Sequence, residues 1–233
     1  GSFKRVKVPK NIRFVALTDF GPDLERILTV FPSPDVYNTL PLALSDFTQV
    51  YIAESEKYAH VTYFINGGYA EPVNGEDWIK IESKTVAHHD TKPEMSASEI
   101  TKKVLGLMKN EKYQFYCINY ANADMVGHTG NLKAAKKAVS TIDTHVGEVV
   151  TATLAKGGQV LIVADHGNAE EMKNLKTGEI DTEHSQNPVP CILIRSGLKG
   201  KKLKDGMLAD VAPTIIKMVG GKQPKEMTGK SLF

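Results

Sequence analysis

Three polar segments of the sequence carry side chains that could bind metal ions. Each combines an aspartate or a histidine with an apolar run or a glycine. The candidate ligands are Asp124, His128, Asp165, His166 and His184. Carboxylates and neutral imidazoles together form mixed oxygen and nitrogen sites, which suit Zn, Mn, Fe or Co better than Ca or soft copper. The residue types therefore predict a site for divalent transition metals.

Five protein ligands are more than one catalytic metal ion takes, because a catalytic site keeps a coordination position open. Two ions about 4 Å apart can hold both the attacking and the leaving oxygen of a phosphoryl group. The five residues therefore favour a two-metal site that carries out phosphoryl transfer.

Other interpretations of these residues stay open. An aspartate and histidine after a strand could form a helix N-cap with a hydrogen-bonding neighbour. Because residues 124–128 include Gly127, we expect them in a loop that need not be helical. The remaining histidines are expected to pack or to lie at the surface, and they are His60, His88, His89 and His145.

Lys57 lies in the first turns of a helix expected over residues 54–64, just after a predicted strand at 49–53. A lysine there could reach a phosphate group bound beyond the end of the strand. On residue type and position alone, a solvated surface lysine is the simpler interpretation.

The predicted elements place the candidate ligands at one edge of a sheet. Strands are expected at 12–18, 49–53, 78–82, 114–119, 159–163 and 190–195, and helices at 39–45, 54–64, 97–109, 131–156 and 208–219. Ser96 and Glu99 have the spacing of a capping box for the third of these helices. Alternating strands and helices predict an α/β fold with a mainly parallel sheet and helices on both faces. Asp124 and Asp165 follow strands, where such sheets bind ligands.

Composition limits the other classes of function. The hydrophobic content of 41% and charged content of 24% are ordinary for a globular protein, and a net charge of +2 does not indicate a nucleic-acid partner. No apolar run reaches the roughly 20 residues that span a bilayer, and no signal peptide is recognisable. Cys117 and Cys191 lie in apolar runs, which favours free buried thiols and a cytoplasmic location.

The N-terminal region carries two further patterns. Gly1-Ser2 resembles an expression scar, and the polar residues up to 10 are expected to form a linker ahead of a domain at 11–233. Asp19-Phe20-Gly21 matches a kinase magnesium motif. Neither a glycine-rich loop nor a His-Arg-Asp loop accompanies it, so a kinase is not indicated.

Long motifs in the chain resemble the cofactor-independent (2,3-bisphosphoglycerate-independent) phosphoglycerate mutases, which belong to the alkaline phosphatase-like metalloenzymes. The segments that carry the resemblance are Asn122–Gly130, Ala164–Glu170, Asn187–Pro190, Glu54–Thr62, Phe64–Gly68, Lys92–Ser96 and Lys225–Leu232. The resemblance extends from about Phe3 to the end of the chain.

The resemblance implies a monomeric glycolytic isomerase that interconverts 3-phosphoglycerate and 2-phosphoglycerate through a phosphoserine. It implies two divalent ions, with manganese expected and Zn, Co or Mg as alternatives. Asp124, His128 and His184 match the residues that hold one ion, and Asp165 and His166 match part of the other shell. Lys57 matches a lysine close to the phosphate, so the resemblance reverses the surface interpretation.

Members of this family are about twice as long as this chain. Their first-strand aspartate, their serine nucleophile and an inserted substrate-binding domain have no match here, so the chain resembles the C-terminal part of the phosphatase-like domain. We therefore expect the chain alone to lack mutase activity. A phosphatase or phosphodiesterase with the same metal shell, or a non-catalytic metal-binding fragment, remains an alternative.

Overall fold

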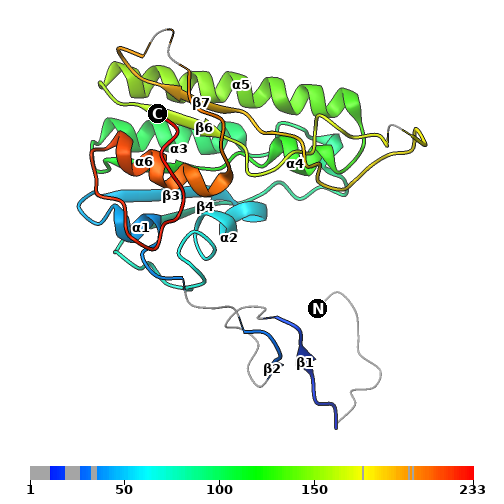
Figure 1. The fold of residues 1–233 in the computed structure, drawn as a ribbon. Helices are drawn as coiled ribbons and strands as arrows, with labels where there is room; N and C mark the ends of the chain where they lie inside the picture. The colour runs from blue at the N-terminus through cyan, green and yellow to red at the C-terminus, as the bar shows by residue number, and fades with distance from the viewer. Residues whose placement is uncertain (1–10, 19–26, 33–35, 175, 199, 201) are drawn as a thin grey trace. The chain divides into compact units, whose positions relative to one another are not determined.

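The computed structural model describes residues 11–18, 27–32, 36–174, 176–198, 200 and 202–233. The chain divides into two compact units, residues 1–36 and 37–233, whose elements are labelled in Figure 1. The linker predicted up to residue 10 and the Asp19-Phe20-Gly21 triplet lie outside the described residues.

The first unit contains one short parallel strand pair. Strand β1 (Val15–Ala16) pairs with β2 (Leu28–Thr29). The strand predicted over residues 12–18 is thus only two residues long in the structure. Its larger apolar side chains, including Phe14 and Leu17, are exposed and only Ala16 is buried. A pair that buries little apolar surface has little to stabilise a longer ladder.

The second unit is built on a three-stranded parallel sheet in the order β4-β3-β5. The central strand is β3 (Gln49–Glu54), which pairs with β4 (Asp77–Ile81) and β5 (Phe115–Ile118). Every residue of β3 is buried. The strand is buried because it is covered on both faces and paired on both edges.

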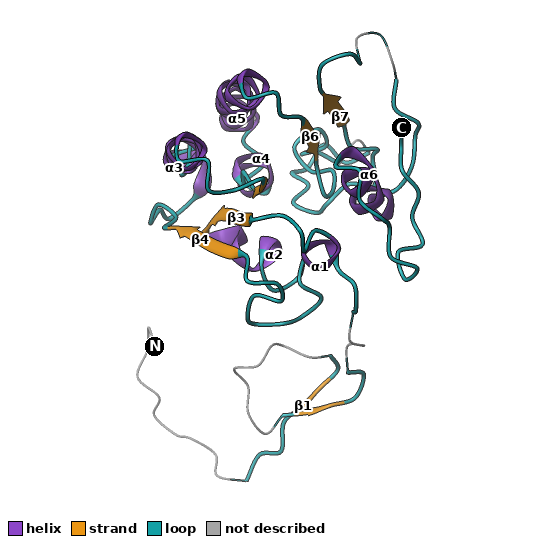
Figure 2. Cartoon of the chain, turned by 90° about the vertical axis from the view of Figure 1, so that its left-hand side faces the viewer, coloured by secondary structure: helices purple, strands orange, loops and turns teal. Residues whose placement is uncertain are grey.

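Helices cover both faces of this sheet (Figure 2). On one face, Val50 and Ile52 pack against helix α3 (Ala97–Lys109) and against Val149 of helix α5 (Leu132–Ala155). On the other face, Tyr51 and Ala53 pack with Val61 of the short helix α2 (Tyr58–Val61). The alternation follows the two-residue period of a strand. The predicted α/β fold is confirmed.

The remaining strands form a separate pair. Strand β6 (Val160–Val163) runs antiparallel to β7 (Cys191–Ile194). The Gln159 side chain donates a hydrogen bond of 2.7 Å to the carbonyl of Met218, at the end of helix α6 (Val211–Met218). A 3-10 turn at Leu208–Asp210 precedes α6, and helix α1 (Leu40–Ala43) precedes β3.

Two local predictions were wrong, both because tertiary contacts compete with local ones. Residues 54–64 form a 3-10 turn (Ser55–Lys57) followed by α2, and the Ser55 hydroxyl donates to the Glu82 carboxylate at 3.0 Å. Ser96 does not form the capping box, because its hydroxyl donates to the Glu82 carbonyl while Glu99 pairs with Lys84. Among the described residues, no helix has the length and apolar character needed to cross a membrane.

Candidate metal centre

Asp124 lies on a short helix rather than in the predicted loop, and His128 directly follows that helix as its C-cap. Helix α4 (Asn122–Gly127) follows β5 after a three-residue connection and has Asp124 in its first turn. A four-residue spacing places Asp124 and His128 on the same helix face. Val126 of α4 packs with small residues of α5, Ala134 and Ala138 among them. This burial stabilises a helix too short to persist alone.

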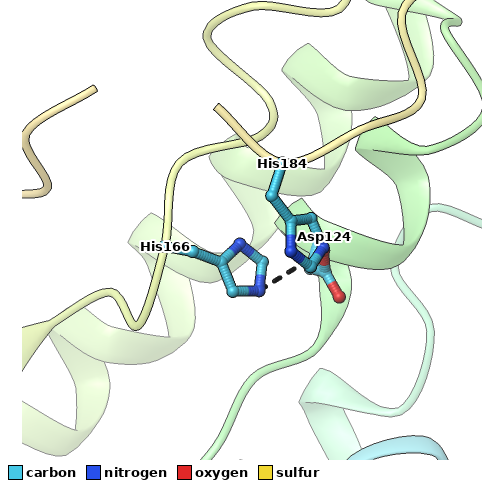
Figure 3. Close-up of side chains that lie close together, drawn as sticks. All are labelled: Asp124, His166 and His184. Atoms are coloured by element: carbon cyan, nitrogen blue, oxygen red, sulfur yellow. Dashed lines mark ion pairs between the residues drawn. The ribbon is translucent and has the colours of Figure 1, made fainter. Parts of the chain in front are cut away.

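Three histidines surround one oxygen of the Asp124 carboxylate. Oδ1 of Asp124 lies 3.0 Å from Nε2 of His128, 3.4 Å from Nε2 of His184 and 3.8 Å from Nε2 of His166. Potential ligand atoms of Asp124, His166 and His184 all lie within 4.8 Å of one another, and Figure 3 shows these side chains pointing toward one another.

The imidazole nitrogens converge as the predicted donor set requires. Nε2 of His184 lies 3.2 Å from Nε2 of His128, and the rings of His184 and His166 stack with centroids 3.6 Å apart. Nδ1 of His128 lies 2.6 Å from the carbonyl oxygen of Thr182. If Nδ1 donates to that carbonyl, Nε2 carries the lone pair that a metal ion needs. The carboxylate oxygen and imidazole nitrogens gathered here therefore fit a divalent metal ion as ligand atoms.

Asp165 lies at the edge of this group. Its side chain is 66% exposed, and Oδ1 lies 3.7 Å from Nε2 of His166. Asp165 comes almost directly after β6 and faces solvent, whereas His166 reaches Asp124. The structure thus gathers three of the other four predicted ligands around Asp124 and leaves Asp165 beside them.

Lys57 lies in the same site. Its Nζ is 2.5 Å from Oδ2 of Asp124, and both side chains are only 14% exposed. Burial raises the pKa of Asp124, but hydrogen bonds from Lys57 and Asn168 and the charge of Lys57 outweigh it and leave the pKa below its usual value. Asp124 is therefore a charged carboxylate at neutral pH.

Asn168 and Glu170 also lie at the candidate metal centre, although the sequence alone predicts no role for them. The side-chain amide of Asn168 donates a hydrogen bond of 2.8 Å to Oδ1 of Asp124. Glu170 accepts from the Ser185 hydroxyl, and this bond, followed by other hydrogen bonds, lowers the pKa of Glu170 to about 2. Both belong to the motif that contains His166, which was the available signal.

The other histidines lie outside the group of ligand atoms. His145 contacts Glu148 on α5, and the ring of His60 meets that of Phe64 at 5.7 Å. Burial, and then the charge of Lys57, lowers the pKa of His60. His88 and His89 line a cavity of about 460 Å³ that also borders His128.

The α/β architecture, with a carboxylate and imidazoles converging beyond strand ends, defines a domain with a candidate metal centre. The model of the Metalloenzyme superfamily matches residues 25–223. The chain belongs to the metalloenzyme superfamily.

The relatives that match the chain belong to a narrower family than this superfamily. The chain is 46% identical to the 2,3-bisphosphoglycerate-independent phosphoglycerate mutase of Clostridium acetobutylicum over 99% of the chain, and 48% identical to that of Clostridioides difficile. These matches cover 45% and 46% of the relatives, so the chain spans less than half the length of the curated relatives it matches.

A solved structure agrees with these sequences. Leishmania mexicana phosphoglycerate mutase, determined at low cobalt concentration, superimposes with a TM-score of 0.86 at 28% identity. The match covers 100% of this chain and 46% of that one. The resemblance to cofactor-independent phosphoglycerate mutases is confirmed.

Proposed function

We propose that this chain is the metal-binding part of a cofactor-independent phosphoglycerate mutase, which interconverts 3-phosphoglycerate and 2-phosphoglycerate through a phosphoserine. The observation that carries the proposal is the convergence of Asp124, three imidazoles and Lys57 in a chain 46% identical to such mutases. A glycolytic and gluconeogenic role follows from that reaction.

Two divalent ions are proposed, with manganese as the expected metal. Asp124, His128 and His184 would hold one ion, and Asp165 and His166 would contribute to the other. When bound, such ions neutralise charge on a transferring phosphoryl group and lower the pKa of an attacking hydroxyl. Lys57 disfavours the protonated form of Asp124, so this proposed ligand is already deprotonated.

Lys57 is proposed to bind the phosphate and thus to act in catalysis. The support is its position: the ammonium is largely buried and lies against a metal-ligating carboxylate. A buried ammonium stabilises negative charge more strongly than an exposed one, because water screens it less. Oxygens of a phosphoryl group carry such charge.

The cellular setting is proposed from chemistry as well. Cys117 and Cys191 are free thiols, which fits a reducing cytoplasm. The mutase acts as a monomer on a small phosphorylated acid, with neither nucleic acid nor membrane as a partner. Light scattering of the purified parent protein tests the oligomeric state, and a stable dimer would contradict it.

Activity measurements test the proposed reaction. The 233-residue chain and the full-length parent are each assayed with 3-phosphoglycerate and Mn²⁺. The parent is expected to form 2-phosphoglycerate, whereas the chain alone forms none, because no segment matches the family's serine nucleophile. Mutase activity in the chain alone would contradict its proposed inactivity. Release of inorganic phosphate by the parent, without 2-phosphoglycerate, would favour a phosphatase.

A further inference from the structure

The Glu170 carboxylate joins the two loops that carry His166 and His184. One oxygen, Oε1, accepts from the hydroxyl of Ser185 and, at 3.1 Å, from the side-chain amide of Asn187. The other, Oε2, accepts from the backbone N–H of Asn168 at 2.9 Å. Ser185 adjoins His184, and Asn168 lies two residues after His166. Four residues thus form the Glu170 bridge: Glu170, Ser185, Asn187 and Asn168.

The Glu170 bridge also reaches Asp124. The backbone N–H of Asn168 donates to Glu170. The side-chain amide of the same residue donates to Oδ1 of Asp124 at 2.8 Å and also contacts the Asp124 carbonyl at 3.3 Å. Asn168 is 4% exposed. One carboxylate is therefore linked to all three segments that supply the converging ligands.

The Glu170 bridge is closely packed. A Cβ atom on Gly167 would lie 2.2 Å from Oγ of Ser185 and 2.4 Å from Oε1 of Glu170. A Cβ atom on Gly127 would lie 2.4 Å from Oδ1 of Asn168. The two glycines let the loops and α4 approach closely. A backbone hydrogen bond of 3.0 Å from Ser185 to Gly167 adds to this contact.

We infer that Glu170, acting through Ser185 and Asn168, is a positioning residue that sets the separation of the metal ligands His184, His166 and Asp124. The inference rests on the proposed metal centre. Both Glu170 oxygens accept hydrogen bonds from the protein, and Glu170 is not among the described residues whose ligand atoms converge, so we assign it an orienting role. Fixing ligands before a metal ion arrives removes the entropy loss that ordering them would otherwise cost.

Manganese affinity of the chain tests this inference. Glu170→Gln keeps the side chain's shape but replaces one acceptor oxygen with an NH₂ group, so at least one of the three donors loses its acceptor. Glu183→Gln is the matched control. It removes one negative charge next to His184, and the exposed Glu183 side chain forms no hydrogen bond or ion pair with the described residues. The dissociation constant for Mn²⁺ is measured by calorimetry, and the melting temperature without metal is measured in parallel.

We expect Glu170→Gln to raise the dissociation constant by about 10–100-fold, the range for groups that orient metal ligands. Glu183→Gln is expected to change it far less. Ser185→Ala keeps the charge and removes one bond of the bridge, so it should give an intermediate increase and serves if Glu170→Gln does not fold. A Glu170→Gln variant that folds and binds Mn²⁺ as tightly as the Glu183→Gln control would overturn the inference.

A second readout separates this inference from the proposed function. In the metal-free chain, nuclear Overhauser contacts between the His166 and His184 rings report their stacking. We expect these contacts in the wild type and their loss in Glu170→Gln. If the wild-type chain binds no Mn²⁺, the metal centre fails. If the rings stay stacked in Glu170→Gln, the positioning role fails whatever the metal result.

Discussion

The two oxygens of Asp124 have different partners, and Lys57 lies against one of them. Nζ of Lys57 is 2.5 Å from Oδ2, whereas Oδ1 lies 3.0 Å from Nε2 of His128. The Asp124 carboxylate therefore connects a buried ammonium to the group of imidazoles. Asp124, a candidate metal ligand, thus lies beside Lys57, a candidate contact for an anion. Transfer of a metal-bound phosphoryl group would require both kinds of group side by side.

Replacement of Lys57 should separate phosphate binding from metal binding. In the full-length parent, Lys57→Gln is expected to lower kcat/KM by about 100-fold or more, comparable to loss of one group that stabilises a transition state. Mn²⁺ affinity should stay the same or rise, because the variant lacks a positive charge that repels the metal. Steady-state kinetics and calorimetry measure the two effects. Lys80→Gln, on an exposed lysine paired with Glu82, is the control and should leave both unchanged.

Removal of a proposed ligand should weaken metal binding far more than removal of another histidine. His184→Ala is expected to raise the Mn²⁺ dissociation constant by more than about 100-fold, beyond the effect typical of an orienting group. His145→Ala is the control, because His145 contacts Glu148 on α5 and lies outside the ligand group. Equal affinities in the two variants would exclude His184 as a ligand.

Glu76 should make stability depend on pH at a place remote from the metal ligands. It is 3% exposed and accepts hydrogen bonds from the side chain of Asn66 and from the backbone N–H groups of Val73 and Asn74. Burial raises the pKa of Glu76, but these hydrogen bonds outweigh it, so the pKa lies below its usual value.

A carboxyl group whose folded pKa is depressed stabilises the fold above its unfolded pKa, which is about 4.3 for Glu. This stability is lost as the pH falls through the folded pKa. Glu76→Gln is expected to cost about 1–3 kcal/mol at pH 7, and the difference from wild type should shrink below about pH 4. Urea unfolding at several pH values measures it. A difference that does not change with pH would contradict the assignment.

The packing of the central strand gives a stability prediction. Ile52 is fully buried against α3, and Ile52→Ala is expected to lower the free energy of unfolding by about 2–5 kcal/mol. Ile192, in β7, is 49% exposed, so Ile192→Ala should cost far less. Denaturant unfolding of both variants checks the contrast. Similar losses would mean that β3 is not the centre of the core.

The fold was predictable where local signals and burial agree. The helix predicted over 97–109 has those bounds, and that predicted over 131–156 is α5 within one residue at each end. Both have an apolar face that packs in the core. Residues 54–64 have a helical pattern as well, but the hydrogen bond from Ser55 to the end of β4 replaces the first helical turn. Contacts between distant residues are not readable from local spacing.

The candidate site was predictable in its residue types but not in its arrangement. Asp124 and His166 could be chosen because each comes shortly after a predicted strand, although the structure places these strands in different sheets, β5 beside β3 and β6 beside β7. The distance of 3.8 Å between Nε2 of His166 and Oδ1 of Asp124 depends on the loop after β6. Gly127 favours a loop in the sequence, yet it is the last residue of helix α4. Its missing Cβ instead makes room for the Asn168 side chain. The orienting roles of Asn168 and Glu170 arise only from folding.

The most direct test is Mn²⁺ binding by the wild-type chain and by Asp124→Asn, measured by calorimetry together with thermal unfolding. The substitution keeps the size of the side chain and removes the charge that faces Lys57 and the imidazoles. The account predicts that the wild type binds Mn²⁺ and melts at a higher temperature with it, as ligand linkage requires, whereas Asp124→Asn shows neither effect. A wild type that does not bind, or a variant that binds equally well, would contradict it.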